Sequence, residues 1–232
     1  MSAITPTAPA IELVVLDMAG TTVVDDGVVE QAFERAALRV GLDRVRPLDE
    51  ALQYVRDTMG QSKIEVFRHL TDEDETAAQN ANRAFEAAYS ELIDEIGVDA
   101  IPGAEAAITA LRSAGIKVAL TTGFSAETRN AVLDRLNWVV DATLSPADAG
   151  RGRPAPDLVL AALIATGASS VASVAVVGDT MSDVLSGRNA GAGLVIGVLT
   201  GAHSRQQLLD AGADLVLESV RDLASVPQLA AR

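Results

Sequence analysis

Residues 11–22 read IELVVLDMAGTT, and this segment decides the fold of the chain. Its apolar part, residues 11–16, is rich in β-branched side chains and bounded by a glycine turn, a pattern typical of a buried parallel strand. Asp17 therefore stands at the carboxyl end of that strand, where open α/β sheets bind their ligands. Gly20 lets the backbone turn sharply with its N–H groups free to face an anion. A carboxylate in the position of Asp17 can attack phosphorus or bind a metal ion.

The chain after this segment first has a helical pattern. Apolar residues recur at i, i+3 and i+4 spacing between residues 28 and 96, in the runs 29–40, 48–59, 63–70 and 77–96. We therefore predict an all-helical cap, residues 25–97, inserted after the first strand. The stretches 25–27 and 97–99 would be its two linkers. A cap hinged there could close over the strand ends and exclude water.

From residue 101 onward, strand and helix patterns alternate. The strands are expected near residues 116–120, 142–144, 174–177, 194–198 and 214–217. Such alternation predicts an α/β core, residues 11–24 and 98–232, with a parallel sheet covered by helices on both faces. Residues 1–10 lack a basic segment followed by an apolar run, so we expect a flexible N-terminal tail there.

The composition limits the possible partners. Eighteen basic and 32 acidic residues give a net charge of −14, which repels nucleic acid and anionic membranes. The chain has no cysteine, which excludes disulfides, thiolate chemistry and Cys-ligated zinc. No apolar stretch approaches the ~20 residues needed to cross a bilayer. We expect a cytoplasmic protein with a small-molecule substrate and with neither a nucleic-acid nor a membrane partner.

Polar motifs follow two more of the predicted strands. Thr121-Thr122-Gly123 offers a hydroxyl and a flexible amide to a phosphoryl oxygen, although by itself it is also an ordinary turn. Arg153, in the loop before a predicted helix at residues 156–165, can hold phosphoryl oxygens bidentately. Most arginines are solvated surface residues, and Arg151 is the rival for this role.

A pair of carboxylates follows the strand at residues 174–177. Asp179 and Asp183 lie four residues apart at a strand-to-helix turn, and such clustered oxygen ligands suit Mg²⁺. Alone, the pair could equally be a capped helix with an acid in its first turn. His203 follows the strand at residues 194–198 and could reach the site, but a role in capping a helix at residues 205–209 or in facing solvent is the expected one.

In this order along the chain, Asp17, Thr122, Arg153 and the pair Asp179 and Asp183 resemble the four motifs of the haloacid dehalogenase (HAD) superfamily. The resemblance implies a Rossmann-like core with Asp17 as the nucleophile. HAD phosphatases usually carry a second aspartate two residues later, which protonates an alkoxide leaving group. This chain has Ala19 there, which implies a leaving group that needs no such proton.

Two HAD branches lack that acid. In the dehalogenases the aspartate attacks carbon, and in the phosphonatases a C–P bond breaks. The dehalogenases need no metal ion, whereas Asp179 and Asp183 make a complete acidic pair, which favours phosphorus over carbon. The run Asp-x-Ala-Gly-Thr-Thr and the arginine at the third motif resemble the phosphonatase branch, the phosphonoacetaldehyde hydrolases.

A phosphonatase also needs an electron sink, because a carbanion is too basic to leave phosphorus unaided. A protonated imine between a lysine and an aldehyde accepts these electrons as an enamine. Lys63 is the single lysine of the predicted cap, and Met59-Gly60 precedes it at the spacing of the phosphonatase Schiff-base segment. For an arbitrary lysine, a solvent-facing place on a helix would be the ordinary interpretation. The resemblance gives Lys63 a catalytic role and Met59 a substrate-binding one.

The resemblance also implies the remaining roles. Mg²⁺ is held by Asp17, the backbone carbonyl of Ala19 and Asp179, with Asp183 orienting metal-bound water. The phosphoryl oxygens are bound by a set of core residues: Gly20, Thr122, Gly123 and Arg153. Lys63 forms the Schiff base while Asp17 becomes an aspartyl phosphate. Phosphonatases carry a histidine three residues after the lysine, where this chain has Val66, a departure that bears on proton shuttling.

The sequence therefore predicts an Mg²⁺-dependent hydrolase that cleaves the C–P bond of phosphonoacetaldehyde or a closely related aldehyde phosphonate. The alternatives are an HAD phosphatase acting on a small phosphate ester, a dehalogenase and a non-catalytic phosphate-binding module. Phosphonatases dimerise through their caps, and the helix at residues 77–96 could serve such a contact in a homodimer.

Overall fold

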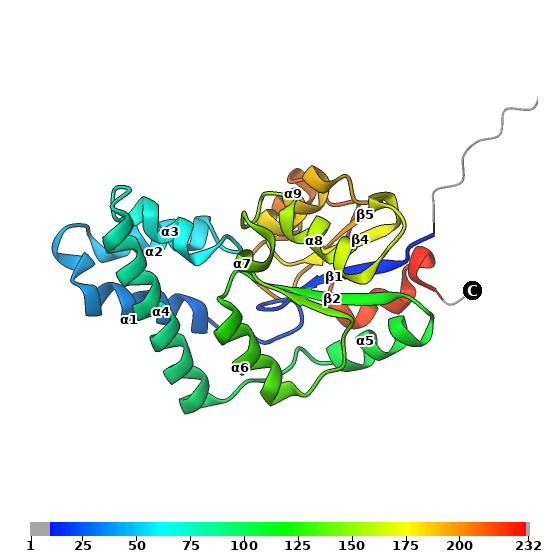
Figure 1. Ribbon diagram of the computed structural model, residues 1–232, viewed down its shortest axis with the longest axis horizontal. Helices are drawn as coiled ribbons and strands as arrows, with labels where there is room; N and C mark the ends of the chain where they lie inside the picture. Colours follow the sequence, from blue (N-terminus) through cyan, green and yellow to red (C-terminus); the bar gives the residue numbers. More distant parts are fainter. Residues whose placement is uncertain (1–9, 231–232) are drawn as a thin grey trace, which may run out of the picture.

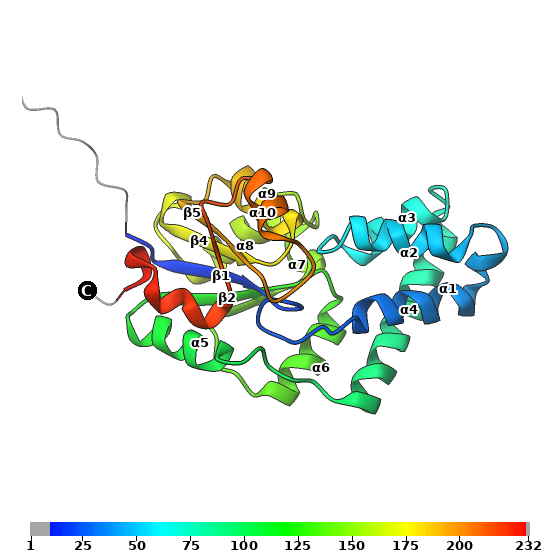
Figure 2. The same cartoon turned by 180° about the vertical axis from the view of Figure 1, so that it is seen from behind.

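A six-stranded parallel sheet forms the centre of the larger half of the molecule (Figures 1 and 2). The computed structural model describes residues 10–230, so the predicted tail at residues 1–10, apart from Ala10, lies outside the described residues. The strand order is β3-β2-β1-β4-β5-β6, which places β1 in the middle with β2 and β4 on either side. The strands are β1 (Leu13–Asp17), β2 (Lys117–Thr121), β3 (Ala142–Leu144), β4 (Val174–Gly178), β5 (Leu194–Val198) and β6 (Leu215–Leu217).

Side chains of β1 alternate between the two faces of the sheet, and each face has its own core. Leu13 and Val15 pack on one face, in a cluster with apolar side chains of α8 (Asp157–Thr166) and α9 (Met181–Ala190). Val14 and Leu16 belong to the cluster on the opposite face. Every residue of β1 is buried, as expected for a central parallel strand. The helices of this half are α5 (Ala104–Ser113), α6 (Ala126–Leu136), α7 (Pro146–Ala149), α8 (Asp157–Thr166), α9 (Met181–Ala190) and α10 (Arg205–Asp210).

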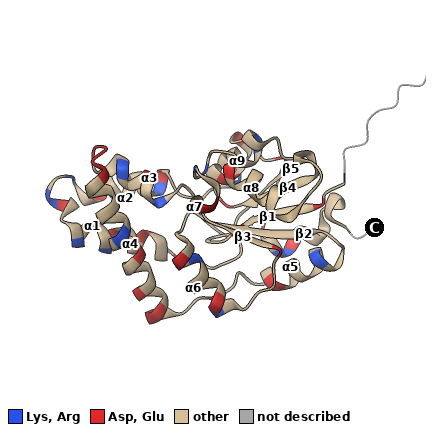
Figure 3. Ribbon diagram, viewed as in Figure 1, with Lys and Arg blue, Asp and Glu red and all other residues tan. Residues whose placement is uncertain are grey.

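Four helices between β1 and β2 form the smaller half, at the left of Figure 1. They are α1 (Val28–Val40), α2 (Leu48–Asp57), α3 (Lys63–Leu70) and α4 (Glu75–Ile96), and short 3₁₀ turns lie at Leu42–Arg44 in this half and at Val171–Ser173, Val220–Ser225 and Pro227–Leu229 in the other. Phe33 of α1 packs against Phe67 and Phe85, with ring centroids 4.9 and 4.6 Å away. Charged residues of both signs occur along these helices, while the strands carry few (Figure 3).

The predicted α/β fold with an inserted all-helical cap is confirmed by this arrangement. Two chain segments connect the halves, and they run side by side. The Val24 amide donates to the Asp99 carbonyl at 2.9 Å, and Val23 forms an antiparallel bridge with Ala100. We propose that this two-stranded connection is the hinge of the cap, with the boundaries given above.

Within residues 10–230, no helix combines the length and the apolar character that a membrane span requires.

Candidate active site

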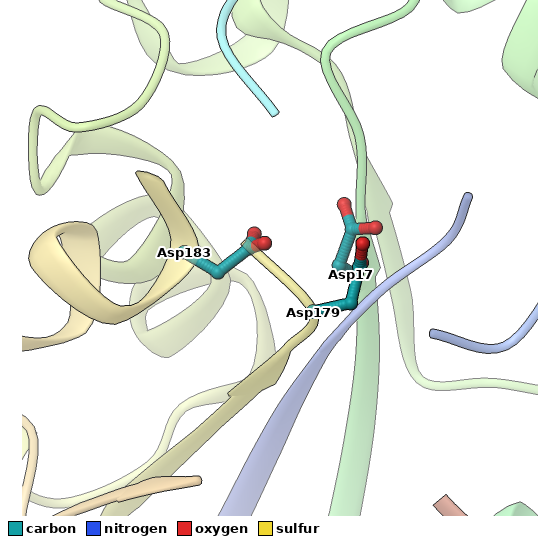
Figure 4. A group of neighbouring side chains, drawn as sticks. All are labelled: Asp17, Asp179 and Asp183. Atoms are coloured by element: carbon teal, nitrogen blue, oxygen red, sulfur yellow. The ribbon is translucent and has the colours of Figure 1, made fainter. Parts of the chain in front are cut away.

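Three carboxylates converge beyond the carboxyl ends of β1 and β4 (Figure 4). Asp17 is the last residue of β1, Asp179 follows β4 directly, and Asp183 lies in the first turn of α9. One oxygen from each carboxylate lies within 4.8 Å of the others, and all three side chains are buried. The sequence interval of 162 residues between Asp17 and Asp179 is closed by the parallel pairing of β1 with β4.

Arg153 is the buried cation of this cluster. Its Nη1 lies 2.6 Å from Asp17 Oδ1, and its Nε lies 3.0 Å from Asp183 Oδ1. Its Nη2 donates to the Thr121 hydroxyl at 2.8 Å, so the guanidinium is fixed in one plane. Arg151, the rival for this role, is exposed and pairs with Asp157 instead.

The buried charges of the cluster do not balance. Burial raises the pKa of Asp17 well above its usual range, against the opposing effect of Arg153. Burial, together with the neighbouring Asp183, raises the pKa of Asp179 to about 7. Three buried carboxylates against one guanidinium leave an excess of negative charge, which a divalent cation would neutralise. The donor set of the site therefore fits Mg²⁺.

The loop after Asp17 is shaped around Asp179. Gly20 has φ of 85°, and a Cβ atom added there would lie 2.6 Å from Asp179 Oδ2, so only glycine fits. The Thr21 hydroxyl donates to Asp179 Oδ1 at 2.9 Å, and the Ala202 amide donates to Oδ2 at 2.9 Å. Among the described residues, no hydrogen bond uses the Ala19 carbonyl, which leaves it available to a cation.

Lys63 reaches the same region from the cap. It is the first residue of α3 and is only 6% exposed. Its Nζ lies 5.4 to 5.8 Å from the centroids of three phenyl rings, those of Phe33, Phe85 and Phe124. Burial lowers the pKa of Lys63, while the nearby Asp25 opposes that change. A lysine in this setting holds a larger fraction of the neutral, nucleophilic amine than an exposed one.

Cap and core residues enclose one small cavity between Lys63 and Asp17. Its volume is about 20 Å³, which is room for roughly one water molecule. It is lined by Asp17, Ala19, Asp25, Val29, Met59, Gly60, Lys63, Thr122, Gly123, Phe124, Arg153, Asp179 and Thr180. The structure thus brings together most of the residues singled out from the sequence. Gly20 and Asp183 lie behind this lining, and the roles of all these residues stay predictions.

The cap segment at residues 59–62 fits closely against core loops because glycines stand at the contacts. A Cβ atom at Gly60 would lie 2.3 Å from the Thr180 hydroxyl oxygen, and one at Gly123 would lie 2.6 Å from the Gln61 carbonyl oxygen. A Cβ atom at Gly152 would lie 2.5 Å from that of Ser62. These contacts hold the cap over the cavity.

The motif at the end of β2 divides its two threonines between two tasks. The Thr121 hydroxyl holds Arg153, while Thr122 lines the cavity, and its hydroxyl oxygen accepts a hydrogen bond from the Phe124 amide at 3.2 Å. Gly123 lines the cavity as well. Thr122 is therefore the threonine that lines the cavity, and its contact with a phosphoryl oxygen stays a prediction.

Two acidic residues near Lys63 carried no sequence signal. Asp25, assigned above to a linker, lines the cavity. Glu86 of α4 accepts hydrogen bonds from the amide and the hydroxyl of Ser125 at 3.3 and 2.7 Å, and another from Thr128. Both positions depend on how the cap packs on the core, which no local pattern encodes.

The expectation for His203 was wrong. It is buried, and its Nδ1 accepts a hydrogen bond from the Met181 amide at 3.2 Å, at the beginning of α9. The predicted helix at residues 205–209 is instead capped by Ser204, whose side chain accepts from Gln207. His203 thus supports the loop that holds Asp179, since its own amide donates to the Asp179 carbonyl at 3.3 Å.

Comparison with known proteins agrees with this geometry. Residues 11–191 match the haloacid dehalogenase-like hydrolase family. The chain is 28% identical to phosphonoacetaldehyde hydrolase of Bacteroides fragilis, over 94% of this chain and 96% of that one. It is 30% identical to the bifunctional phosphonoacetaldehyde hydrolase/aminoethylphosphonate transaminase of Clostridioides difficile, but that match covers 78% of this chain and only 30% of the longer protein.

Among solved structures, the chain is similar to a phosphonoacetaldehyde hydrolase-like protein from Oleispira antarctica. The TM-score is 0.81 at 23% identity, covering 97% of this chain and 94% of that one, which shows a shared fold. With its parallel sheet, its acidic cluster and the family match over residues 11–191, the chain belongs to the haloacid dehalogenase-like hydrolases, in their phosphonatase-like branch.

Proposed function

We propose that this hydrolase cleaves the C–P bond of phosphonoacetaldehyde or of a closely related aldehyde phosphonate. One observation carries the proposal: the buried amine of Lys63 and the carboxylate of Asp17 line the same small cavity. A phosphatase mechanism does not need an amine as an electron sink. Ala19, on the same cavity wall, offers no acid for an alkoxide leaving group.

The two sides of the cavity carry groups that match the chemistry of the two ends of such a substrate. On the core side, Arg153, Thr122 and Gly123 offer donors to the phosphonate oxygens. On the cap side, Lys63 would condense with the aldehyde and form a protonated imine. The electrons of the breaking C–P bond then move into this imine and give an enamine, while Asp17 takes the phosphoryl group.

The positive charge of Arg153 would assist the transfer of the phosphoryl group to Asp17. Because it already contacts Asp17, it can hold the nucleophile and a phosphonate oxygen in one plane. When bound by Asp17, Asp179 and the Ala19 carbonyl, Mg²⁺ would reduce the repulsion between the carboxylate and the phosphonate.

The side chains around Lys63 also limit which carbonyl compounds the site can accept. Three phenyl rings surround the amine, and the nearest charged groups on the cap side are the acids Asp25 and Glu86. A substrate with a carboxylate on its carbonyl carbon would meet these acids without a free cation. We therefore expect an aldehyde to be cleaved and 3-phosphonopyruvate to be rejected.

Borohydride trapping tests the proposal directly. The chain has two lysines, Lys63 and Lys117, so peptide mass mapping after incubation with phosphonoacetaldehyde and borohydride assigns an adduct unambiguously. We expect the adduct at Lys63, its loss in Lys63→Arg and its survival in Lys117→Arg. The absence of a lysine adduct, or equal labelling of both lysines, would show that the imine mechanism is wrong.

A phosphatase acting on a small phosphate ester is the second candidate. The observation in its favour is that the phosphoryl side of the site is complete without the cap lysine, since Asp17, Arg153 and Asp179 all belong to the core. For such an enzyme, Lys63→Arg would leave the release of phosphate unchanged. The same variant thus separates the two functions.

A further inference from the structure

Asp25 lies where it can serve the amine of Lys63. It belongs to the connection between β1 and α1, and it lines the closed cavity together with Lys63. Its Oδ1 accepts a hydrogen bond from the Val29 amide at 3.0 Å, which fixes the carboxyl group at the beginning of α1. Within residues 10–230, its second oxygen accepts no hydrogen bond and is free for a partner in the cavity.

The charged groups that face Lys63 come from several elements. Asp25 belongs to the hinge, Asp17 to β1, Glu86 to α4 and Arg153 to the loop before α8, and each acts on the charge of the amine. No ion pair within 4 Å links Lys63 to any acid in the described chain. The amine is thus near acids without being tied to one, which leaves space for a carbonyl oxygen between them.

Three other titratable side chains of this region, Asp17, Glu86 and His69, have partners elsewhere. Asp17 is held by Arg153 and is the predicted nucleophile. Glu86 is held by Ser125 and Thr128. His69 stacks on Tyr54 at a centroid distance of 4.0 Å, and neither of them lines the cavity.

We propose that Asp25 is the acid–base residue that transfers protons during formation and hydrolysis of the Lys63 imine. This inference rests on the proposed function and adds to it a residue for which the family motifs gave no signal. Burial raises the pKa of Asp25, which favours a carboxyl group that can hold a proton between two steps.

Three proton transfers convert the Lys63 ammonium and the carbonyl group into the imine. Asp25 first takes a proton from the Lys63 ammonium, and the freed Nζ lone pair forms a bond to the carbonyl carbon. The carbonyl π electrons move to the oxygen, which takes a proton from nitrogen to give a carbinolamine. Asp25 then gives its proton to that hydroxyl group, which leaves as water while the nitrogen lone pair completes the C=N bond. Asp25 ends as a carboxylate beside the cationic imine, and hydrolysis reverses these steps.

Asp25→Asn tests this role, with Asp26→Asn as the matched control. The asparagine can still accept the hydrogen bond from Val29, and Asp26 is exposed beside it in the same connection. Rapid-quench borohydride trapping with phosphonoacetaldehyde measures the rate of imine formation at Lys63. We expect that rate to fall about 100-fold in Asp25→Asn, the usual scale of acid–base catalysis, and to change less than twofold in Asp26→Asn.

The pH profile of imine formation separates a proton-transfer role from a structural one. In the native enzyme, the rate should fall at low pH when Asp25 and Lys63 both hold protons, and at high pH when neither does. In Asp25→Asn it should rise continuously with pH until Lys63 loses its proton, because no second group remains.

Each outcome decides a separate claim. Equal trapping rates or equal profiles in the native enzyme and in Asp25→Asn would overturn the role of Asp25 while leaving the imine mechanism in place. A lysine adduct missing from the native enzyme would overturn the proposed function itself. Thermal unfolding of both variants, expected within a few degrees of the native protein, shows that the fold is kept.

Discussion

The core side of the cavity is lined by charged groups fixed by hydrogen bonds, whereas the cap side places one amine among aromatic rings. The core side holds three carboxylates and a guanidinium, fixed by hydrogen bonds from Thr21, Thr121 and Ala202. The cap side holds one amine among phenyl rings, with acids near it but none in contact. The core side is suited to bind and transfer a phosphoryl group in general. Under the proposed function, the cap side would determine which bond is broken.

Removing the nucleophile should produce the largest effect, because it disables the side that both candidate functions share. Asp17→Asn should lower phosphate release from a phosphonate and from a phosphate ester on the order of 10⁴-fold or more, since an amide cannot attack phosphorus. Phosphate release under steady-state conditions measures this. Activity that survives the change would show that Asp17 is not the nucleophile.

Removing the Lys63 amine should affect phosphonoacetaldehyde cleavage and phosphate-ester turnover to different extents. Lys63→Met should lower phosphonoacetaldehyde cleavage on the order of 10³-fold, because the electron sink is lost. Turnover of any phosphate ester that the enzyme accepts should change only a few-fold. A parallel loss of both activities would mean that Lys63 acts in phosphoryl transfer as well, and the division drawn here would be wrong.

The same variant should be more stable than the native protein. Lys63 has a folded-state pKa below the ordinary value of 10.5, so between those two values the unfolded chain binds more protons and stability rises with pH. Methionine removes that pH dependence. It also removes the cost of burying the ammonium group, so the free energy of unfolding should rise by about 1 kcal/mol at neutral pH. Urea unfolding at pH 7 and at pH 9.5 checks both statements.

Removing Mg²⁺ should affect only the core side of the cavity, because its expected ligands belong to the core. Because the folded-state pKa of Asp179 is about 7, against an ordinary value of 3.8, the metal-free protein binds more protons than the unfolded chain between these values. Its stability should therefore fall as pH rises from 4 to 7. Saturating Mg²⁺ should raise the free energy of unfolding by about 2 to 3 kcal/mol at pH 7.5 and by much less at pH 5. Thermal unfolding with EDTA or with Mg²⁺ measures the difference.

The smallest expected effect concerns how the two sides are held together. Glu86 joins the cap to the beginning of α6, so Glu86→Gln should weaken the closed state by about 1 kcal/mol and raise KM about threefold to fivefold. Glu91→Gln, on the same helix but bonded to Arg39 within the cap, is the control and should leave KM unchanged. An equal change in both variants would exclude a specific role in closure.

Much of the core side could be predicted from the sequence because its residues are tied to strand ends. Asp17, Thr122 and Asp179 each follow an apolar run, and a parallel sheet brings the ends of such runs together. The order of the strands and the position of Arg153 between Asp17 and Asp183 could not be predicted. They depend on pairings and loop paths that local patterns do not contain.

The cap side was less predictable, for a reason that lies in its helices. Helical periodicity shows which residues are buried but not which buried residue faces the core. Phe85 of α4 is buried in the cap, and its ring lies beside the Lys63 amine, which helical periodicity does not show. Asp25 was placed in a linker, together with Asp26 and Gly27. The resemblance pointed to Lys63, and only tertiary packing revealed its surroundings.

The small volume of the closed cavity sets a condition on the kinetics of the enzyme. With room for about one water molecule, it cannot admit a substrate or release phosphate while the Gly60 loop lies on the core. Under the proposed function, each turnover would therefore include a movement of the cap away from the core, and kcat could not exceed the frequency of that motion. A catalytic rate that falls as solvent viscosity rises would be the signature of this limit.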